Sequence, residues 1–99
     1  MERAIDRIEP FQRAIAKAHL ASAGISIDAL DHKPLIAVAN SWNEICPGHE
    51  PLKQLAEEVK KGILEAGGEP IEFNTVAMCD GIAQGSPGMR YCLPHREII

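Results

Sequence analysis

The run Leu35-Ile36-Ala37-Val38-Ala39 decides the expected fold, and the polar stretch Asn40-Ser41-Trp42-Asn43-Glu44 follows it directly. A short, continuous apolar run is typical of a strand buried on both faces of a parallel or mixed sheet. The polar stretch would then lie at the carboxyl end of that strand, where open α/β sheets bind their ligands. Asn40, Ser41 and Asn43 could form hydrogen bonds to a ligand there. An equally good interpretation is that they cap the strand and turn the chain.

A helix and a second strand are expected after this run. Apolar residues recur at helical spacing over residues 52–64, Pro51 fits the first turn, and Gly67-Gly68 ends the helix. Residues 71–78 begin with alternating apolar and polar side chains and finish as a continuous apolar run, which predicts a strand. Strand, helix and strand of these lengths predict a right-handed βαβ crossover with parallel strands. The expected fold class is α/β, a βαβ crossover unit with flanking helices that is part of a larger α/β domain.

Helices are expected on both sides of this unit. The spacing over residues 9–24 predicts a helix with one apolar stripe and with its basic residues turned to solvent. The stripe consists of Phe11, Ala14, Ile15 and Ala18, and the basic residues are Arg13 and Lys17. His19, at the edge of the stripe, is better explained as a partly buried helix residue than as a metal ligand. Residues 25–33 are predicted to form a loop with one short turn, and residues 93–99 the first turn of a helix.

Composition argues against several classes of protein. The 99 residues are 45% hydrophobic and 24% charged, which is typical of a single globular unit. The net charge of −4 and the scattered basic residues argue against nucleic-acid binding. No apolar segment approaches the roughly 20 residues that cross a bilayer, and the mixed-charge start does not resemble a signal peptide. A cytoplasmic protein is therefore expected.

The three cysteines, Cys46, Cys79 and Cys92, are widely spaced, and their odd number argues against a disulfide framework. We expect reduced thiols, although each could ligate an iron–sulfur cluster together with cysteines elsewhere. Cys46 and His49 precede a predicted helix N-terminus, a setting that can lower the pKa of a thiol or hold an anion. A structural turn with a buried thiol is the favoured interpretation of Cys46.

Asp80 is the candidate metal ligand. It follows the second predicted strand, at the same edge of the sheet as Asn40, and a glycine-rich loop comes after it. Mg²⁺ is commonly held by one or two carboxylates together with water and substrate oxygens, so this position suits a hard cation. The alternative is a turn aspartate that binds its own backbone. The loop has neither the P-loop spacing nor the dinucleotide spacing of glycines, so no phosphate cradle is predicted.

Six ordered motifs together resemble the amino-terminal part of the dihydroxy-acid dehydratase family, which also contains phosphogluconate and sugar-acid dehydratases. The motifs are Pro34-Leu35-Ile36-Ala37-Val38-Ala39-Asn40-Ser41, Pro47-Gly48-His49, Ala66-Gly67-Gly68, Glu72-Phe73-Asn74-Thr75, Asp80-Gly81-Ile82-Ala83 and Gly88-Met89-Arg90-Tyr91. The resemblance implies that residues 1–99 are the amino-terminal part of the dehydratase α/β domain. Residues 1–32 would form a helical lead-in, residues 33–99 the βαβ unit and the metal-binding loop, and the chain is expected to be truncated at its C-terminus.

The family resemblance implies an iron–sulfur and Mg²⁺-dependent hydro-lyase. Such enzymes convert 2,3-dihydroxy carboxylates to 2-keto acids in the synthesis of valine and isoleucine. Asp80 matches the family's magnesium-binding aspartate, while no catalytic residue and no ligand of the [2Fe-2S] or [4Fe-4S] cluster is assigned within this chain. The full-length enzyme is expected to be a homo-oligomer, a dimer, that acts on a small-molecule dihydroxy acid, and residues 1–99 alone are expected to be inactive.

Several positions depart from the family pattern. Gly48 stands where many members carry a cluster cysteine, and Cys79 is not at the usual cluster position. Ser86 and His95 replace residues that are commonly histidine and serine. A phosphogluconate or sugar-acid dehydratase, which Cys79 and Gln84 favour mildly, is therefore an alternative. A non-catalytic interaction module is another.

Overall fold

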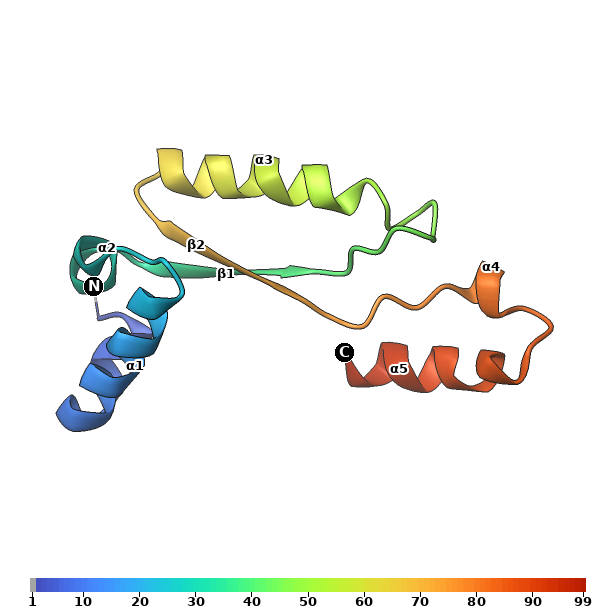
Figure 1. The fold of residues 1–99 in the computed structure, drawn as a ribbon, viewed down its shortest axis with the longest axis horizontal. Helices are drawn as coiled ribbons and strands as arrows, with labels where there is room; N and C mark the ends of the chain where they lie inside the picture. The colour runs from blue at the N-terminus through green and yellow to red at the C-terminus, as the bar shows by residue number, and fades with distance from the viewer. Residues whose placement is uncertain (1) are drawn as a thin grey trace. The chain divides into compact units, whose positions relative to one another are not determined.

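A computed structural model describes residues 2–99, which divide into two compact units. The first unit contains residues 2–36 and 61–71, and the second contains residues 37–60 and 72–99. In chain order the elements are η1 (Ala4–Arg7), α1 (Pro10–Ser22), α2 (Ile27–His32), β1 (Leu35–Asn40), α3 (Leu52–Glu65), β2 (Glu69–Asn74), α4 (Asp80–Ala83), η2 (Pro87–Tyr91) and α5 (Cys92–Ile98) (Figure 1). The helix predicted over residues 93–99 is therefore present as α5.

The strands β1 and β2 form one two-stranded sheet, and α3 lies between them in the sequence. At the start of the strands, the Pro34 carbonyl accepts a hydrogen bond from the Glu69 amide at 2.9 Å. At their ends, the Asn40 carbonyl accepts one from the Thr75 amide at 2.6 Å. Because start pairs with start and end with end, the strands are parallel and their register is continuous. The α/β class and the βαβ arrangement are confirmed.

The second strand is shorter than predicted. It ends at Asn74, and the apolar residues 76–78 are irregular. The physical reason is that β1 also ends, at Asn40, so the chain beyond Thr75 has no neighbouring strand with which to pair. Asp80 therefore follows a five-residue irregular segment instead of the strand itself.

The core of the first unit contains a helix where a loop was predicted. The Ser26 side chain accepts a hydrogen bond from the Ala29 amide at 3.1 Å, and this N-cap starts α2. Ala29 and Leu30 are fully buried, and Ile5 is also buried. The Arg3 guanidinium donates to the carbonyl of Leu30 at 2.5 Å, which fixes the start of the chain against the end of α2.

Helix α1 buries none of its residues. Phe11 is 69% exposed, whereas the Lys17 ammonium, expected in solvent, lies 2.6 Å from the Asp31 carboxylate of α2. The prediction did not include α2, which supplies this partner at the surface. His19 is exposed rather than partly buried. The start of α1 is as expected, since Pro10 is in the first turn and the Glu9 carboxylate accepts from two backbone amides.

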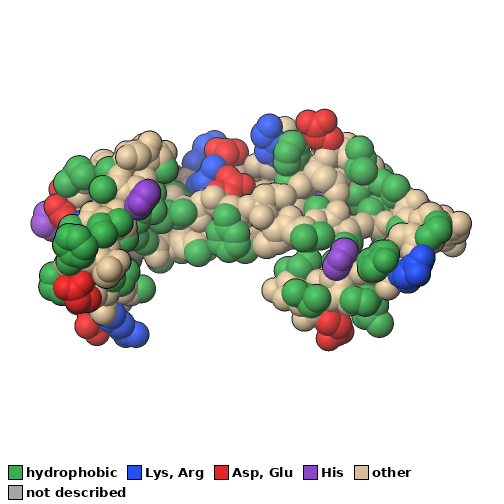
Figure 2. Space-filling view, turned by 60° about the horizontal axis from the view of Figure 1, so that its bottom comes forward, with side chains coloured by type: hydrophobic (Ala, Val, Ile, Leu, Met, Phe, Trp, Pro, Cys, Tyr) green, Lys and Arg blue, Asp and Glu red, His purple; other side chains and the backbone are tan. Residues whose placement is uncertain are grey.

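The βαβ elements are more exposed than predicted. Ile36 in β1, expected to be buried, is 41% exposed, and Leu55 in α3 is 56% exposed, while Ala56 is the buried residue of that helix. Figure 2 shows hydrophobic side chains over much of the visible surface. Two strands and one helix present too few elements to cover both faces of a sheet and the apolar face of a helix.

The two glycines after α3 have separate roles. Gly67 has a φ of +93°, the left-handed conformation that ends helices and that glycine adopts without strain. Gly68 is a packing position, because a Cβ there would lie 3.0 Å from Ile63 Cγ2 and 3.3 Å from Ile36 Cγ1. The absence of a side chain at Gly68 therefore lets the backbone between α3 and β2 pass close to Ile63 and Ile36.

Candidate functional site

The polar stretch after β1 joins β1 to the chain that follows β2. The Ser41 hydroxyl lies 2.8 Å from that of Thr75, and the Trp42 amide donates to the Asn74 side chain at 3.0 Å. The Asn43 amide group donates to the Ala77 carbonyl at 3.1 Å. These bonds satisfy the polar stretch within the second unit, which favours the capping interpretation over direct ligand binding.

Asn40 is part of a separate, structural cluster. Its side chain is buried and donates to the Glu72 carboxylate at 2.9 Å, and the Lys60 ammonium lies 2.8 Å from the same carboxylate. Lys60, followed by Asn40, lowers the pKa of Glu72. Glu57 and Glu72 in turn raise the pKa of Lys60. The cluster ties β1, β2 and α3 together, and the Asn40 side chain is occupied by these bonds.

The turn at Cys46 is tightly built. The Asn43 side-chain oxygen accepts from the Cys46 amide at 2.8 Å, and the Cys46 carbonyl accepts from the amides of His49 and Glu50, both at 2.9 Å. The His49 ring nitrogen Nδ1 lies 2.5 Å from the Ser41 carbonyl. Cys46 is buried, as the structural interpretation predicted. The turn nevertheless places its sulfur and the imidazole beside the same cavity.

Cys79 lies next to Cys46 although 33 residues separate them. The Cys46 thiol donates a hydrogen bond to the Cys79 sulfur, with the two sulfurs 2.8 Å apart. This bond, followed by the backbone N–H of Ile82, lowers the pKa of Cys79, while burial and the Asp80 carboxylate act in the opposite direction. The sequence did not predict this pairing, because no local pattern links two cysteines on separate turns.

Asp80 begins α4 and holds its carboxylate toward α5. The side chain is 47% exposed, and its carboxylate lies 3.2 Å from the Arg96 guanidinium, which is itself 55% exposed. Burial, and then a hydrogen bond to Asp80, raise the pKa of Cys92. Arg96 is not among the residues predicted from sequence, since only the fold of residues 80–96 brings this cation to the Asp80 carboxylate.

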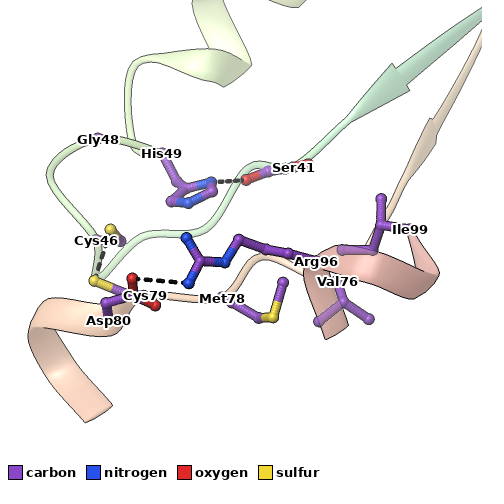
Figure 3. Close-up of a pocket in the computed structure, with 10 residues that line it drawn as sticks. All are labelled: Ser41, Cys46, Gly48, His49, Val76, Met78, Cys79, Asp80, Arg96 and Ile99. Carbon is purple, nitrogen blue, oxygen red and sulfur yellow. Dashed lines mark hydrogen bonds and ion pairs between the residues drawn. The ribbon is translucent and has the colours of Figure 1, made fainter. Parts of the chain in front are cut away.

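A cavity of about 490 Å³ collects these groups (Figure 3). Its walls come from the turn after β1, from the segment after β2 and from α5. They include Ser41, Cys46, Gly48, His49, Val76, Met78, Cys79, Asp80, Arg96 and Ile99. The predicted candidates Cys46, His49, Cys79 and Asp80 are thus brought together, whereas Asn40 and Asn43 are not part of the lining.

The cavity offers Mg²⁺ one carboxylate ligand, that of Asp80. Asp80 is partly exposed and already pairs with a cation, and one carboxylate with water and substrate oxygens is a usual magnesium arrangement. Within residues 2–99, no three His, Cys, Asp or Glu side chains are grouped so as to hold a metal ion by themselves. Cys46 and Cys79 have the donor type of an iron–sulfur cluster but are too few for its usual ligand set.

The sequence profile described as "Dihydroxy-acid/6-phosphogluconate dehydratase N-terminal" matches residues 33–99, which include both cysteines of the pair, Asp80 and Arg96. The chain belongs to this dehydratase family. It is 63% identical over 73 residues to a dihydroxy-acid dehydratase of Ignicoccus hospitalis, an overlap that covers 74% of the chain and 13% of the relative. The match to dihydroxy-acid dehydratase 1 of Methanosarcina acetivorans is 53% over 88 residues and covers 89% of the chain and 16% of the relative.

A dihydroxy-acid dehydratase of Pyrococcus abyssi is 49% identical over 88 residues, which cover 89% of the chain and 16% of the relative. The chain thus spans about one seventh of the length of these relatives. Across residues 2–99, none of the helices has the length and apolar character needed to cross a membrane.

Proposed function

We propose that this chain supplies one wall of the active site of a dihydroxy-acid dehydratase, with Asp80 as a ligand of the catalytic Mg²⁺. The reaction would be the dehydration of a 2,3-dihydroxy carboxylate to a 2-keto acid in branched-chain amino-acid synthesis. The observation that carries the proposal is the position of Asp80. It stands on the wall of the cavity, within the matched residues, where the family resemblance puts a magnesium-binding aspartate.

The residues around Asp80 prepare its carboxylate for a cation. Arg96 faces it at 3.2 Å, and both side chains are partly exposed, so the ion pair is weak and a divalent cation can replace the guanidinium. A bound Mg²⁺ would act as a Lewis acid toward the oxygens of the substrate. The bonds of Ser41 and Asn43 to residues 75 and 77 would hold the segment that leads to Asp80.

For the whole protein we also propose an iron–sulfur cluster, a dimeric state and a cytoplasmic location. Two neighbouring thiols provide fewer ligands than a cluster usually has, so ligands from elsewhere in the protein would be needed. Cys92 is buried and contacts the Asp80 carboxylate, and we give it no role as a cluster ligand.

A chimaera tests the proposal. Residues 33–99 would replace the matching segment of the Methanosarcina acetivorans relative, with which the chain shares 53% identity over 88 residues. We expect conversion of 2,3-dihydroxyisovalerate to its 2-keto acid, and a loss of roughly 100-fold or more in kcat/KM for Asp80→Asn, as found when a charge-stabilising group is removed from an active site. Glu44→Gln, which removes an exposed carboxylate on another turn, is the matched control.

Two outcomes would count against the proposal. Activity of Asp80→Asn equal to that of the unsubstituted chimaera would remove Asp80 from the reaction. A chimaera that is selective for 6-phosphogluconate over 2,3-dihydroxyisovalerate would favour the phosphogluconate dehydratase alternative. Residues 1–99 by themselves are expected to give no turnover, because they contribute a single proposed metal ligand and no assigned catalytic residue.

A further inference from the structure

Two of the three cysteines are placed as a reactive pair. Cys46 Sγ and Cys79 Sγ are 2.8 Å apart, less than 1 Å longer than the roughly 2.05 Å of a disulfide bond. Both sulfurs are free thiols on the wall of the same cavity. The contact joins two turns that lie far apart in the sequence, and it belongs entirely to the second unit.

The surrounding backbone holds both thiols in place. Cys46 is fixed by the bond from its amide to the Asn43 side chain and by the two amides that donate to its carbonyl. Asn43 also donates to the Ala77 carbonyl at 3.1 Å, two residues before Cys79. One side chain, that of Asn43, therefore holds the two turns that carry the sulfurs next to each other.

We propose that Cys46 and Cys79 are an oxidation site, which forms an intrachain disulfide when the chain meets a small-molecule disulfide. The bond would fix the Cys46 turn to the segment that carries Asp80. Once joined in a disulfide, the two sulfurs could no longer bind a soft metal as thiolates. This inference does not depend on the reaction proposed above.

The chemistry is thiol–disulfide exchange. Cys79 is the less buried thiol, so its sulfur attacks one sulfur of the oxidant RSSR, giving a mixed disulfide and releasing RSH. The Cys46 sulfur then attacks the Cys79 sulfur of the mixed disulfide and releases the second RSH. Two cysteine thiols are oxidised, one RSSR is reduced to two RSH, and the two thiol protons leave on the released thiols.

Cys92 provides the internal comparison. In an unfolded chain the shortest loop closes most readily, and Cys79 is separated from Cys92 by far fewer residues than from Cys46. Loop-closure entropy then favours the Cys79–Cys92 disulfide by about fourfold over Cys46–Cys79. The folded chain should reverse this order, because Cys46 faces Cys79 while Cys92 is buried in α5.

The experiment oxidises residues 1–99, purified in reduced form, with oxidised glutathione in native buffer and in concentrated urea. Acid quenching, alkylation and trypsin digestion separate the cysteines, since Cys46, Cys79 and Cys92 fall in tryptic peptides 18–53, 62–90 and 91–96. Mass spectrometry then gives the amount of each disulfide. In native buffer we expect Cys46–Cys79 to exceed Cys79–Cys92 by roughly tenfold or more, as the high effective concentration of neighbouring groups requires. In urea we expect the order to reverse.

Single substitutions complete the test. Cys92→Ser should leave the native yield of the Cys46–Cys79 disulfide unchanged, whereas Cys46→Ser should leave Cys79 as a mixed disulfide with glutathione. Asn43→Ala should lower the native excess of Cys46–Cys79, because the shared anchor is lost. The proposal is overturned if native buffer gives the same distribution as urea, or if Cys79–Cys92 is the main native product.

Discussion

The two units hold their key residues in different ways. In the first, Ala29 and Leu30 are fully buried and the Arg3 guanidinium binds the carbonyl of Leu30, so position is fixed by packing. In the second, the cavity wall carries Asp80 and Arg96 half exposed, and position is fixed by hydrogen bonds between turns. The difference teaches that a packed core fixes Leu30 in the first unit, while the charged groups of the second unit are held at an accessible surface.

The largest expected effect lies in the core of the first unit. Leu30→Ala should lower the free energy of unfolding by about 2–5 kcal/mol, because it removes a fully buried side chain and leaves a cavity. Urea unfolding followed by circular dichroism measures the change. Ile27→Ala, on the same helix but 58% exposed, is the control and should cost far less. Equal losses for the two variants would show that α2 is not packed as described.

The glycine after α3 gives the next largest effect. Gly68→Ala should cost about 1–3 kcal/mol, because its Cβ would lie 3.0 Å from Ile63 Cγ2 in a closely packed turn. Gly62→Ala meets open space inside α3 and should stabilise the chain by about 0.5–1 kcal/mol. The same urea titration compares them. A Gly68→Ala variant as stable as the parent would contradict the close approach of α3 and β1.

A pH dependence should separate the cluster of Asn40, Glu72 and Lys60 from the cavity at Asp80. Lys60 and Asn40 lower the pKa of Glu72 in the folded chain, so their stabilisation is present above the ordinary glutamate pKa of about 4.3 and is lost as the pH falls through the folded value. Glu72→Gln should flatten this acid limb of the stability profile. Glu44→Gln, at an exposed position, should keep it. If Glu72→Gln lost stability at low pH as the parent does, Glu72 would not be the source of that pH dependence.

The smallest effect is expected at the cavity itself. Arg96→Ala should change the free energy of unfolding by less than about 1 kcal/mol, because an ion pair with both partners half exposed contributes little. Thermal unfolding at low and high salt is the measurement, with Arg90→Ala as a control on another exposed arginine. A loss of several kcal/mol would mean that Arg96 is structural, like Arg3, and that Asp80 is not available to a cation.

Features that depend on neighbouring residues in the sequence were predicted correctly, whereas features that depend on distant partners were not. The parallel βαβ unit and the helix stop at Gly67-Gly68 were predictable, because periodicity and glycine geometry are local. The surroundings of α1 were predicted less well, since none of its residues is buried and Lys17 pairs with Asp31 of a helix that the pattern did not indicate. The strand after α3 was predicted too long because β1 provides no partner beyond Asn40.

The site was only partly predictable for the same reason. Asp80 and the Cys46–His49 turn were singled out from local sequence. Their meeting with Cys79 and Arg96 required the two turns and α5 to fold together. No spacing rule indicates that Cys46 contacts Cys79, 33 positions later in the sequence. Nor does any rule indicate that Arg96 of α5 pairs with Asp80 at the start of α4.

Metal binding at Asp80 tests the central claim most directly. The chimaera that carries residues 33–99 would be titrated with Mn²⁺, followed by electron paramagnetic resonance, with Mg²⁺ as competitor. The account predicts one Mn²⁺ per chain, displaced by Mg²⁺, with binding weakened at least about tenfold in Asp80→Asn and unchanged in Glu44→Gln. Equal Mn²⁺ affinity in the Asp80→Asn variant and its parent would contradict it.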